Sequence, residues 1–176
     1  MTAGYTVRPP TPADHGRWRE LNAAYAAFYQ AEQAEQAEQT EQAAATVWSW
    51  LSDPHHEVNA LLAVTPAGRV VALAHYRTFA RPLTASTGCY LDDLYVEPPV
   101  RGTGVVDALL AELRLLAQRN GWSVVRWITA HDNDRARGQV RPGRHSHRLD
   151  HLRHNLRRPT CSLSSAHCTT ARSCSA

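Results

Sequence analysis

The sequence contains no lysine, so all 19 of its basic side chains are arginines. It has no run of about 18 apolar residues, which excludes a membrane-spanning helix on the usual length criterion. The first five residues, Met1 to Tyr5, lack the basic and then apolar pattern of a secretory signal, so a cytoplasmic location is the default expectation. The four cysteines are too few and too unevenly spaced for a disulfide framework in a chain of 176 residues.

Aromatic residues are also missing from the C-terminal part of the chain, because all 13 of them lie before Thr129. The formal charge of +3 divides unevenly: residues 1–137 carry −3, whereas residues 138–176 carry +6. Burial of large apolar side chains is what offsets chain entropy, so the last segment cannot build much of a core. We therefore predict one folded domain over residues 1–137 and a disordered basic tail over residues 138–176.

The spacing of apolar residues predicts an α/β domain whose first strands are mostly antiparallel. Asp14 suits the start of a helix that continues to about Leu51, and a low-complexity Ala-Glu-Gln stretch at residues 31–42 interrupts it. That stretch is expected to be a solvated helical extension or a flexible linker. Strands are predicted at residues 5–8, 58–65, 69–78, 88–96 and 123–129, a further helix at 103–119, and a last helix after Asp132.

Two glycines, Gly102 and Gly104, lie between a predicted strand and the clearest predicted helix of the chain. The first amides of a helix have no partner within the helix, and the helix dipole adds partial positive charge, so such a helix start binds phosphate. Glycine permits a close backbone approach, and Arg101 adds a cation. The spacing fits neither the nucleotide P-loop nor the dinucleotide-binding GxGxxG pattern.

The segment Arg-Gly-Thr-Gly-Val-Val at residues 101–106 resembles the acetyl-CoA signature of the GCN5-related N-acetyltransferases, Arg/Gln-x-x-Gly-x-Gly/Ala. Arg101 and Gly104 match this signature, whereas Val106 stands where the family prefers Gly or Ala. The strand Leu-Asp-Asp-Leu-Tyr-Val at residues 91–96 and the order of elements extend the resemblance from about residue 5 to 137.

This resemblance implies a mixed, mainly antiparallel sheet flanked by helices, and an enzyme that uses acetyl-CoA as acetyl donor. The acetyl group would pass to an amine of a small molecule or peptide by direct attack in a ternary complex. The family binds the pantetheine arm like an added strand, through main-chain groups that correspond here to Leu94, Tyr95 and Val96. The remaining donor-binding positions would be Arg101, Gly102, Thr103, Gly104, Val105, Val106 and Asn133, although a helix cap explains Asn133 equally well.

An alkyl amine has a pKa of about 10.4, so the acceptor needs a base or a proton path at neutral pH. The segment Tyr-Leu-Asp-Asp at residues 90–93 resembles the Tyr-Leu-Glu-Asp of the diamine acetyltransferases within this family. That resemblance assigns Asp92 as the base, and Asp93 as a group that helps to hold the cationic acceptor. Adjacent strand residues point to opposite faces, so only one of the two is expected to face the acceptor cleft.

His75 and Tyr76, on the neighbouring predicted strand, are candidates to line the acceptor cleft, and a core or surface role is the alternative for each. Either aspartate could instead simply pair with an arginine, for which Arg77, Arg81 and Arg126 are the candidates. No metal ligand set is predicted, and a homodimer is left open.

The resemblance ends after Ala136, where the family continues with an apolar residue and a Tyr that often protonates the departing CoA thiolate. This chain has Gln139 and Val140 there instead. With suitable synonymous codons, residues 139–153 read one base later spell Arg-Tyr-Asp-Arg-Val-Ala-Thr-Arg-Thr-Asp-Trp-Ile-Thr-Tyr-Asp. We therefore hypothesise that the chain is translated out of frame from about residue 138, which would leave a sheet edge unpaired and remove the general acid.

Two functional interpretations of the tail are not favoured by its composition. Its seven arginines could bind nucleic acid through phosphate contacts, but it has no aromatic residue for base stacking. Its histidines and cysteines do not follow a zinc-site spacing. We therefore expect neither a nucleic-acid nor a membrane partner, and the alternative to an active enzyme is a catalytically impaired acyl-CoA-binding protein of the same family.

Overall fold

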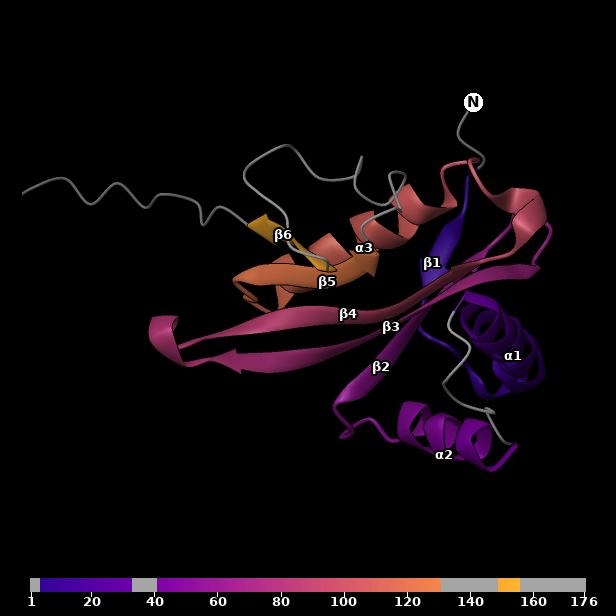
Figure 1. Ribbon diagram of the computed structural model, residues 1–176, viewed down its shortest axis with the longest axis horizontal. Coiled ribbons are helices and arrows are strands. Elements are labelled where there is room, and N and C mark those ends of the chain that lie inside the picture. The colour runs from indigo at the N-terminus through magenta and orange to yellow at the C-terminus, as the bar shows by residue number, and fades with distance from the viewer. Residues whose placement is uncertain (1–3, 33–40, 131–148, 156–176) are drawn as a thin grey trace, which may run out of the picture.

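The computed structural model describes residues 4–32, 41–130 and 149–155, and these residues are built around one sheet (Figure 1). Its six strands lie side by side in sequence order. All neighbouring strands run antiparallel except β4 and β5, which run parallel. The strands are β1 (Thr6–Arg8), β2 (Val58–Val64), β3 (Val70–Arg81), β4 (Ser86–Val96), β5 (Val124–Ala130) and β6 (Leu149–Asn155), and the helices are α1 (His15–Glu32), α2 (Glu41–Ser52) and α3 (Val105–Arg119).

Helix α3 covers one face of the sheet, which we call the α3 face (Figure 1). Its apolar residues recur every three or four positions, so Leu109 and Leu113 both point at the strands and are fully buried. They pack in one cluster with Ala74 of β3, Leu91 of β4 and Val125 of β5. This cluster holds the three central strands and α3 in fixed positions.

Helices α1 and α2 cover the opposite face, which we call the α1 face (Figure 1). Trp18 and Leu21 of α1 are fully buried there, against Leu62 of β2, Leu73 of β3 and Tyr95 of β4. These strand residues belong to the half of the sheet where β3 begins and β4 ends. The other half of the α1 face, where β3 ends and β4 begins, is not part of this cluster.

The start of α1 is fixed by a buried carboxylate. Asp14 accepts two hydrogen bonds from the guanidinium of Arg8, at 2.7 and 2.9 Å, and one from the amide of Thr11 at 2.7 Å. The Arg8 guanidinium, more than any other neighbour, holds the pKa of Asp14 well below its ordinary value. This pair connects β1 to the beginning of α1.

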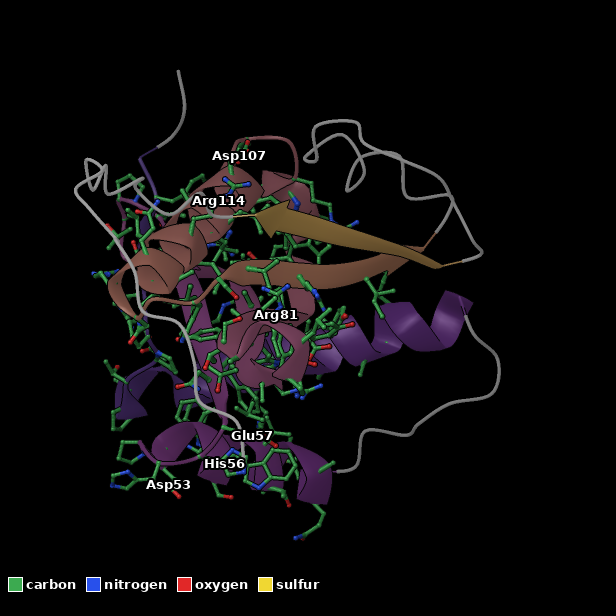
Figure 2. All side chains as sticks on the ribbon, turned by 90° about the vertical axis from the view of Figure 1, so that its left-hand side faces the viewer. Asp53, His56, Glu57, Arg81, Asp107 and Arg114 are labelled. Atoms are coloured by element: carbon green, nitrogen blue, oxygen red, sulfur yellow. The ribbon has the colours of Figure 1, made fainter. Side chains whose placement is uncertain are left out.

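Strands β3 and β4 form a long hairpin that extends past the helices (Figure 1). Its tip is a short 3-10 turn, Pro82–Thr84, in which Leu83 is fully exposed. Arg81, labelled at the tip in Figure 2, donates a hydrogen bond of 2.7 Å to the Ser123 hydroxyl and so ties the hairpin to the start of β5. In the same view Asp107 of α3 and His56 of the loop after α2 lie on opposite sides of Arg81.

The elements predicted from the sequence within the described residues are confirmed to within three residues at each end. The Ala-Glu-Gln stretch begins in the last turn of α1 and ends in the first turn of α2, and its residues 33–40 lie outside the described residues. The helix expected after Asp132 also lies outside them. None of the helices in the described ranges is long and apolar enough to cross a membrane.

The structure has a strand after β5 that the sequence analysis did not predict. Strand β6 pairs with β5 along its whole length, from Val124 opposite Asn155 to Ala130 opposite Leu149. Ladder hydrogen bonds use backbone N–H and C=O groups, which every residue except proline supplies in full, so a segment without aromatic residues can still extend a sheet. The rest of the tail, residues 138–148 and 156–176, lies outside the described residues.

Candidate active site

The turn between β4 and α3 leaves the first amides of the helix without a helical partner. Gly102 and Gly104 have positive φ values of 83° and 89°, a conformation that L side chains disfavour. The first helical hydrogen bond runs from the Ala108 amide to the Gly104 carbonyl, at 3.1 Å, so the helix does not use the amides of Val105 and Val106. These amides and the helix dipole together suit a phosphate group.

The turn itself is braced by side chains. Arg101 folds back, so that its Nε donates a 3.0 Å hydrogen bond to the Val96 carbonyl and its Cζ lies 5.6 Å from the ring centre of Phe28. The Thr103 hydroxyl donates to the Val100 carbonyl at 2.7 Å and lies 2.6 Å from the Tyr5 hydroxyl. Arg101 therefore holds the end of β4 to the turn, and its cation lies against an aromatic ring of α1.

Strands β4 and β5 pair only over a short stretch and then separate. The parallel register includes Cys89 opposite Val125 and ends with Leu91 opposite Trp127, although β4 continues to Val96 and β5 to Ala130. In the part of the chain that the structure describes, the edge of residues 92–96 that faces β5 therefore has no strand partner. This is the geometry that strand addition by an extended ligand requires, and the opening lies beside the free amides of α3.

A β-bulge lies where the two strands begin to separate. In the β3–β4 register His75 is opposite Asp93 but Tyr76 is opposite Leu91, so Asp92 is an extra residue on β4. A bulge changes the direction in which side chains point. Asp92 contacts Arg77 and Asp93 contacts His75, and these two partners lie two residues apart on one strand.

The prediction that Asp92 and Asp93 point to opposite faces is therefore wrong. Strict alternation holds only in a regular strand, and the bulge places both carboxylates on the α1 face. The two carboxylates consequently act on the same side of the sheet, at the point where β4 and β5 separate.

The carboxylate of Asp93 is held by a buried pair of side chains. Trp18 Nε1 donates a 2.9 Å hydrogen bond to His75 Nε2, and His75 Nδ1 lies 3.0 Å from Asp93 Oδ2. An indole N–H can only donate, so His75 Nε2 is the acceptor and Nδ1 carries the hydrogen that is donated to Asp93. His75 is only 4% exposed, whereas 38% of the Asp93 side chain is exposed, so the chain of hydrogen bonds runs from the core to the surface.

Asp92 has a different environment. Burial raises the pKa of its carboxyl above the ordinary 3.8, and this effect outweighs the lowering by Arg77, whose Nε donates to Asp92 Oδ1 at 3.2 Å. Of the three candidate arginines, Arg77 is the one that pairs with Asp92. A carboxylate with a raised pKa is a better proton acceptor than an ordinary one.

Tyr76 does not lie with the carboxylates. It points into the cluster on the α3 face, next to Trp122, and burial raises its pKa to about 12. Its side chain follows the alternation of β3, which places His75 on the α1 face and Tyr76 on the other. The alternative core role therefore describes Tyr76, and the expectation that it lines the acceptor cleft is wrong.

The remaining donor-binding candidates take two forms. Leu94, Tyr95 and Val96 offer main-chain groups along the open edge of β4, while their side chains pack into the two clusters. Val106, which departs from the family signature, packs its side chain against the cluster on the α3 face. Asn133 lies outside the described residues.

Sequence reasoning missed Trp18 as a part of the site. Trp18 lies in α1, and 57 residues separate it from His75 in the sequence. A buried Trp usually finds a hydrogen-bond partner for its N–H, and a His on an apolar strand is one of the few acceptors in a core. The presence of Trp18 and His75 in apolar segments was therefore the signal that could have predicted this contact.

The fold and the site together define a class: an α/β transferase in which a parallel strand pair opens beside a helix start and a pair of carboxylates. A family model described as the acetyltransferase (GNAT) family matches residues 18–139, which is more than half of the chain. The chain therefore belongs to the GNAT family of acetyltransferases and is an N-acetyltransferase.

Similarity to known proteins agrees with this assignment. The D-amino-acid N-acetyltransferase of Saccharomyces cerevisiae is 28% identical over 131 residues, which cover 74% of this chain and 78% of the relative. The fold is similar to that of a ribosomal-protein-alanine N-acetyltransferase from Brucella melitensis biovar Abortus 2308, with a TM-score of 0.62, 19% identity and coverage of 82% of this chain and 97% of that one. An aminoglycoside 6'-N-acetyltransferase from Acinetobacter baumannii gives a TM-score of 0.59 at 14% identity, with coverage of 77% and 86%.

Proposed function

We propose that this protein transfers the acetyl group of acetyl-CoA to an amine of a small molecule or peptide, by direct attack in a ternary complex. The observation that carries the proposal is the opening between β4 and β5, which has the free amides of α3 at one end and the carboxylates of Asp92 and Asp93 at the other. A single extended donor would contact both ends of this opening.

The chain would bind the donor mainly through backbone groups. The amides of Val105 and Val106 would receive the pyrophosphate, and the open edge of Leu94 to Val96 would bind the pantetheine amides. Acetyl-CoA supplies a thioester, whose carbonyl carbon is the electrophile. Because Val106 packs against the α3-face cluster, its departure from the family signature leaves the backbone donors in place.

The two carboxylates would handle the acceptor. Asp93, held by His75, would bind the acceptor ammonium group, and Asp92 would take the proton that the ammonium must lose before nitrogen attacks the thioester. The new bond joins nitrogen to the carbonyl carbon, and the carbon–sulfur bond breaks. The departing thiolate then needs a proton, and the family residue for that task corresponds to position 140, outside the described residues.

Calorimetry with acetyl-CoA and an acetylation assay over a panel of polyamines, amino acids and peptides would test this function. Binding with turnover of at least one amine is expected. If the chain binds no acetyl-CoA, the proposal is overturned.

A catalytically impaired acyl-CoA-binding protein is the second candidate, and Val140 in place of the family Tyr is the observation that favours it. Binding of acetyl-CoA without turnover of any amine would support it. Sequencing the coding DNA tests the underlying hypothesis, which predicts a second frame that continues the domain from about residue 138. If no other frame gives a plausible domain ending, the hypothesis of out-of-frame translation fails.

A further inference from the structure

A row of side chains crosses three strands on the α1 face, next to the two carboxylates. Arg77 of β3 lies opposite Tyr90 of β4, and Tyr90 lies opposite Arg126 of β5. Arg77 Cζ is 5.5 Å from the Tyr90 ring centre, and Arg126 Cζ is 5.1 Å from the Phe79 ring centre. Contact with a ring face restrains a guanidinium without using its N–H donors. All four side chains are half-buried, in the half of the face that the cluster of α1 and α2 does not cover.

The Arg77 guanidinium is only partly used by its neighbours. It contacts Asp92 through Nε, and among residues 4–32, 41–130 and 149–155 its two terminal nitrogens make no hydrogen bond. A guanidinium offers five N–H donors in a planar fork that matches a carboxylate. Arg77 can therefore keep its contact with Asp92 and bind a second carboxylate through the terminal nitrogens.

Charge is separated along this part of the face. Asp93 and Asp92 lie at one end, and Arg77 and Arg126 lie at the other. In an α-amino acid a single carbon separates the ammonium nitrogen from the carboxylate carbon, so a site for both groups needs a carboxylate and a guanidinium close to each other. Asp92 and Arg77 meet this requirement, with 3.2 Å between Arg77 Nε and the Asp92 carboxylate.

We infer that the acceptor is an amine that carries a carboxylate beside its amino group, as a free α-amino acid does, and that Arg77 binds this carboxylate. The inference rests on the proposed function, because it names the acceptor of the same site. An amine without a carboxylate would still meet Asp92 and Asp93, but it would make no contact with the terminal nitrogens of Arg77. Arg77 is thus the specificity-determining residue.

The test compares acceptors that differ only in the carboxylate: phenylalanine, as each enantiomer, against phenethylamine, and alanine against ethylamine. We expect kcat/KM to be at least about tenfold higher for an acid than for its decarboxylated partner, since hydrogen bonds to charged groups are among the stronger ones. In Arg77→Gln the KM of the acid should rise by about tenfold or more. The KM of the matched amine should stay the same or fall.

The decisive quantity is the ratio of kcat/KM for the acid to kcat/KM for its decarboxylated partner. Both acceptors use the same base, so a general effect on the site changes both values and leaves their ratio unchanged. Arg119→Gln is the matched control, since Arg119 lies at the exposed end of α3 and pairs with Glu112. It should leave the ratio unchanged. Arg77→Glu should reverse the ratio in favour of the amine.

Failure of this inference is distinguishable from failure of the proposed function. If decarboxylated amines are acetylated as well as the acids, or if Arg77→Gln keeps the wild-type ratio, the inference is overturned while the acetyltransferase function stands. If no amine is turned over, calorimetry of phenylalanine and phenethylamine in the presence of CoA gives the same comparison as a ratio of Kd values. The inference is then supported if the wild type binds phenylalanine more tightly than phenethylamine and Arg77→Gln removes this difference. Equal binding of the two compounds, or no binding of either, overturns it.

Discussion

His75 donates through Nδ1 to Asp93 Oδ2 at 3.0 Å, and this contact fixes the direction of a partly exposed carboxylate from inside the core. The imidazole can do this because its other nitrogen is occupied by the indole N–H of Trp18. The orientation of Asp93 therefore depends on a residue in α1 that never reaches the surface.

Replacing Trp18 with Phe should destabilise the protein and weaken acceptor binding. The change leaves His75 Nε2 buried without its donor, which costs about 1–3 kcal/mol in addition to the lost packing. Urea unfolding measures the free energy, and the acceptor KM should rise while the Kd for acetyl-CoA stays constant.

Trp48→Phe is the matched control for that substitution. Trp48 packs on Trp18, with 5.2 Å between ring centres, and its indole makes no hydrogen bond among the described residues. It should lose packing energy only. If the two variants lose the same free energy and keep the same acceptor KM, the Trp18–His75 hydrogen bond does not orient Asp93.

Asp92→Asn should lower kcat by about 10²–10⁴-fold, the usual contribution of a general base. In the wild type, burial raises the pKa of Asp92 above its ordinary 3.8, so activity should fall as the pH drops through this raised pKa and the carboxylate takes up a proton. The pH profile of kcat/KM checks this, because Asp92→Asn should lose that acid limb. Arg77 lowers the pKa of Asp92, so Arg77→Gln should move the limb to higher pH. An identical acid limb in all three proteins would contradict the role of Asp92.

Much of the fold could be predicted from the sequence, because the elements depend on local patterns. The period of apolar residues in α3 and the two glycines before it are read directly along the chain. The position of the two aspartates could not be read in this way. Their common face depends on a bulge, and the bulge exists only in the register between β4 and β3, where His75 meets Asp93 and Tyr76 meets Leu91.

Alanine at Gly104 should weaken acetyl-CoA binding. Gly104 has a φ of 89°, and an L residue there costs about 1–2 kcal/mol, so the turn would either remain strained or move the amides of Val105 and Val106. We expect the Kd for acetyl-CoA to rise by about tenfold in calorimetry.

Gly16→Ala is the control. Gly16 lies in helix α1, and a methyl group added there would meet no other atom, so this substitution should stabilise the protein by about 0.5–1 kcal/mol. Wild-type affinity and stability in Gly104→Ala would show that the turn does not need glycine.

Asp14→Asn should make the free energy of unfolding less dependent on pH in the acid range. The Arg8 guanidinium holds the pKa of Asp14 well below its ordinary 3.8, so the folded state binds a proton less readily than the unfolded chain. The stabilisation is therefore complete above the ordinary value and is lost as the pH falls through the lowered one. At neutral pH the variant should lose about 1.5–3 kcal/mol, the range for a hydrogen bond to a charged group. Near pH 2, about two units below the ordinary carboxyl range, the difference from the wild type should be smaller. Urea unfolding at both pH values measures the two differences.

Glu20→Gln is the control, because Glu20 is exposed beside Arg17 and its change should have little effect at either pH. A difference that is equally large at both pH values would show that Asp14 acts by packing and not by its charge.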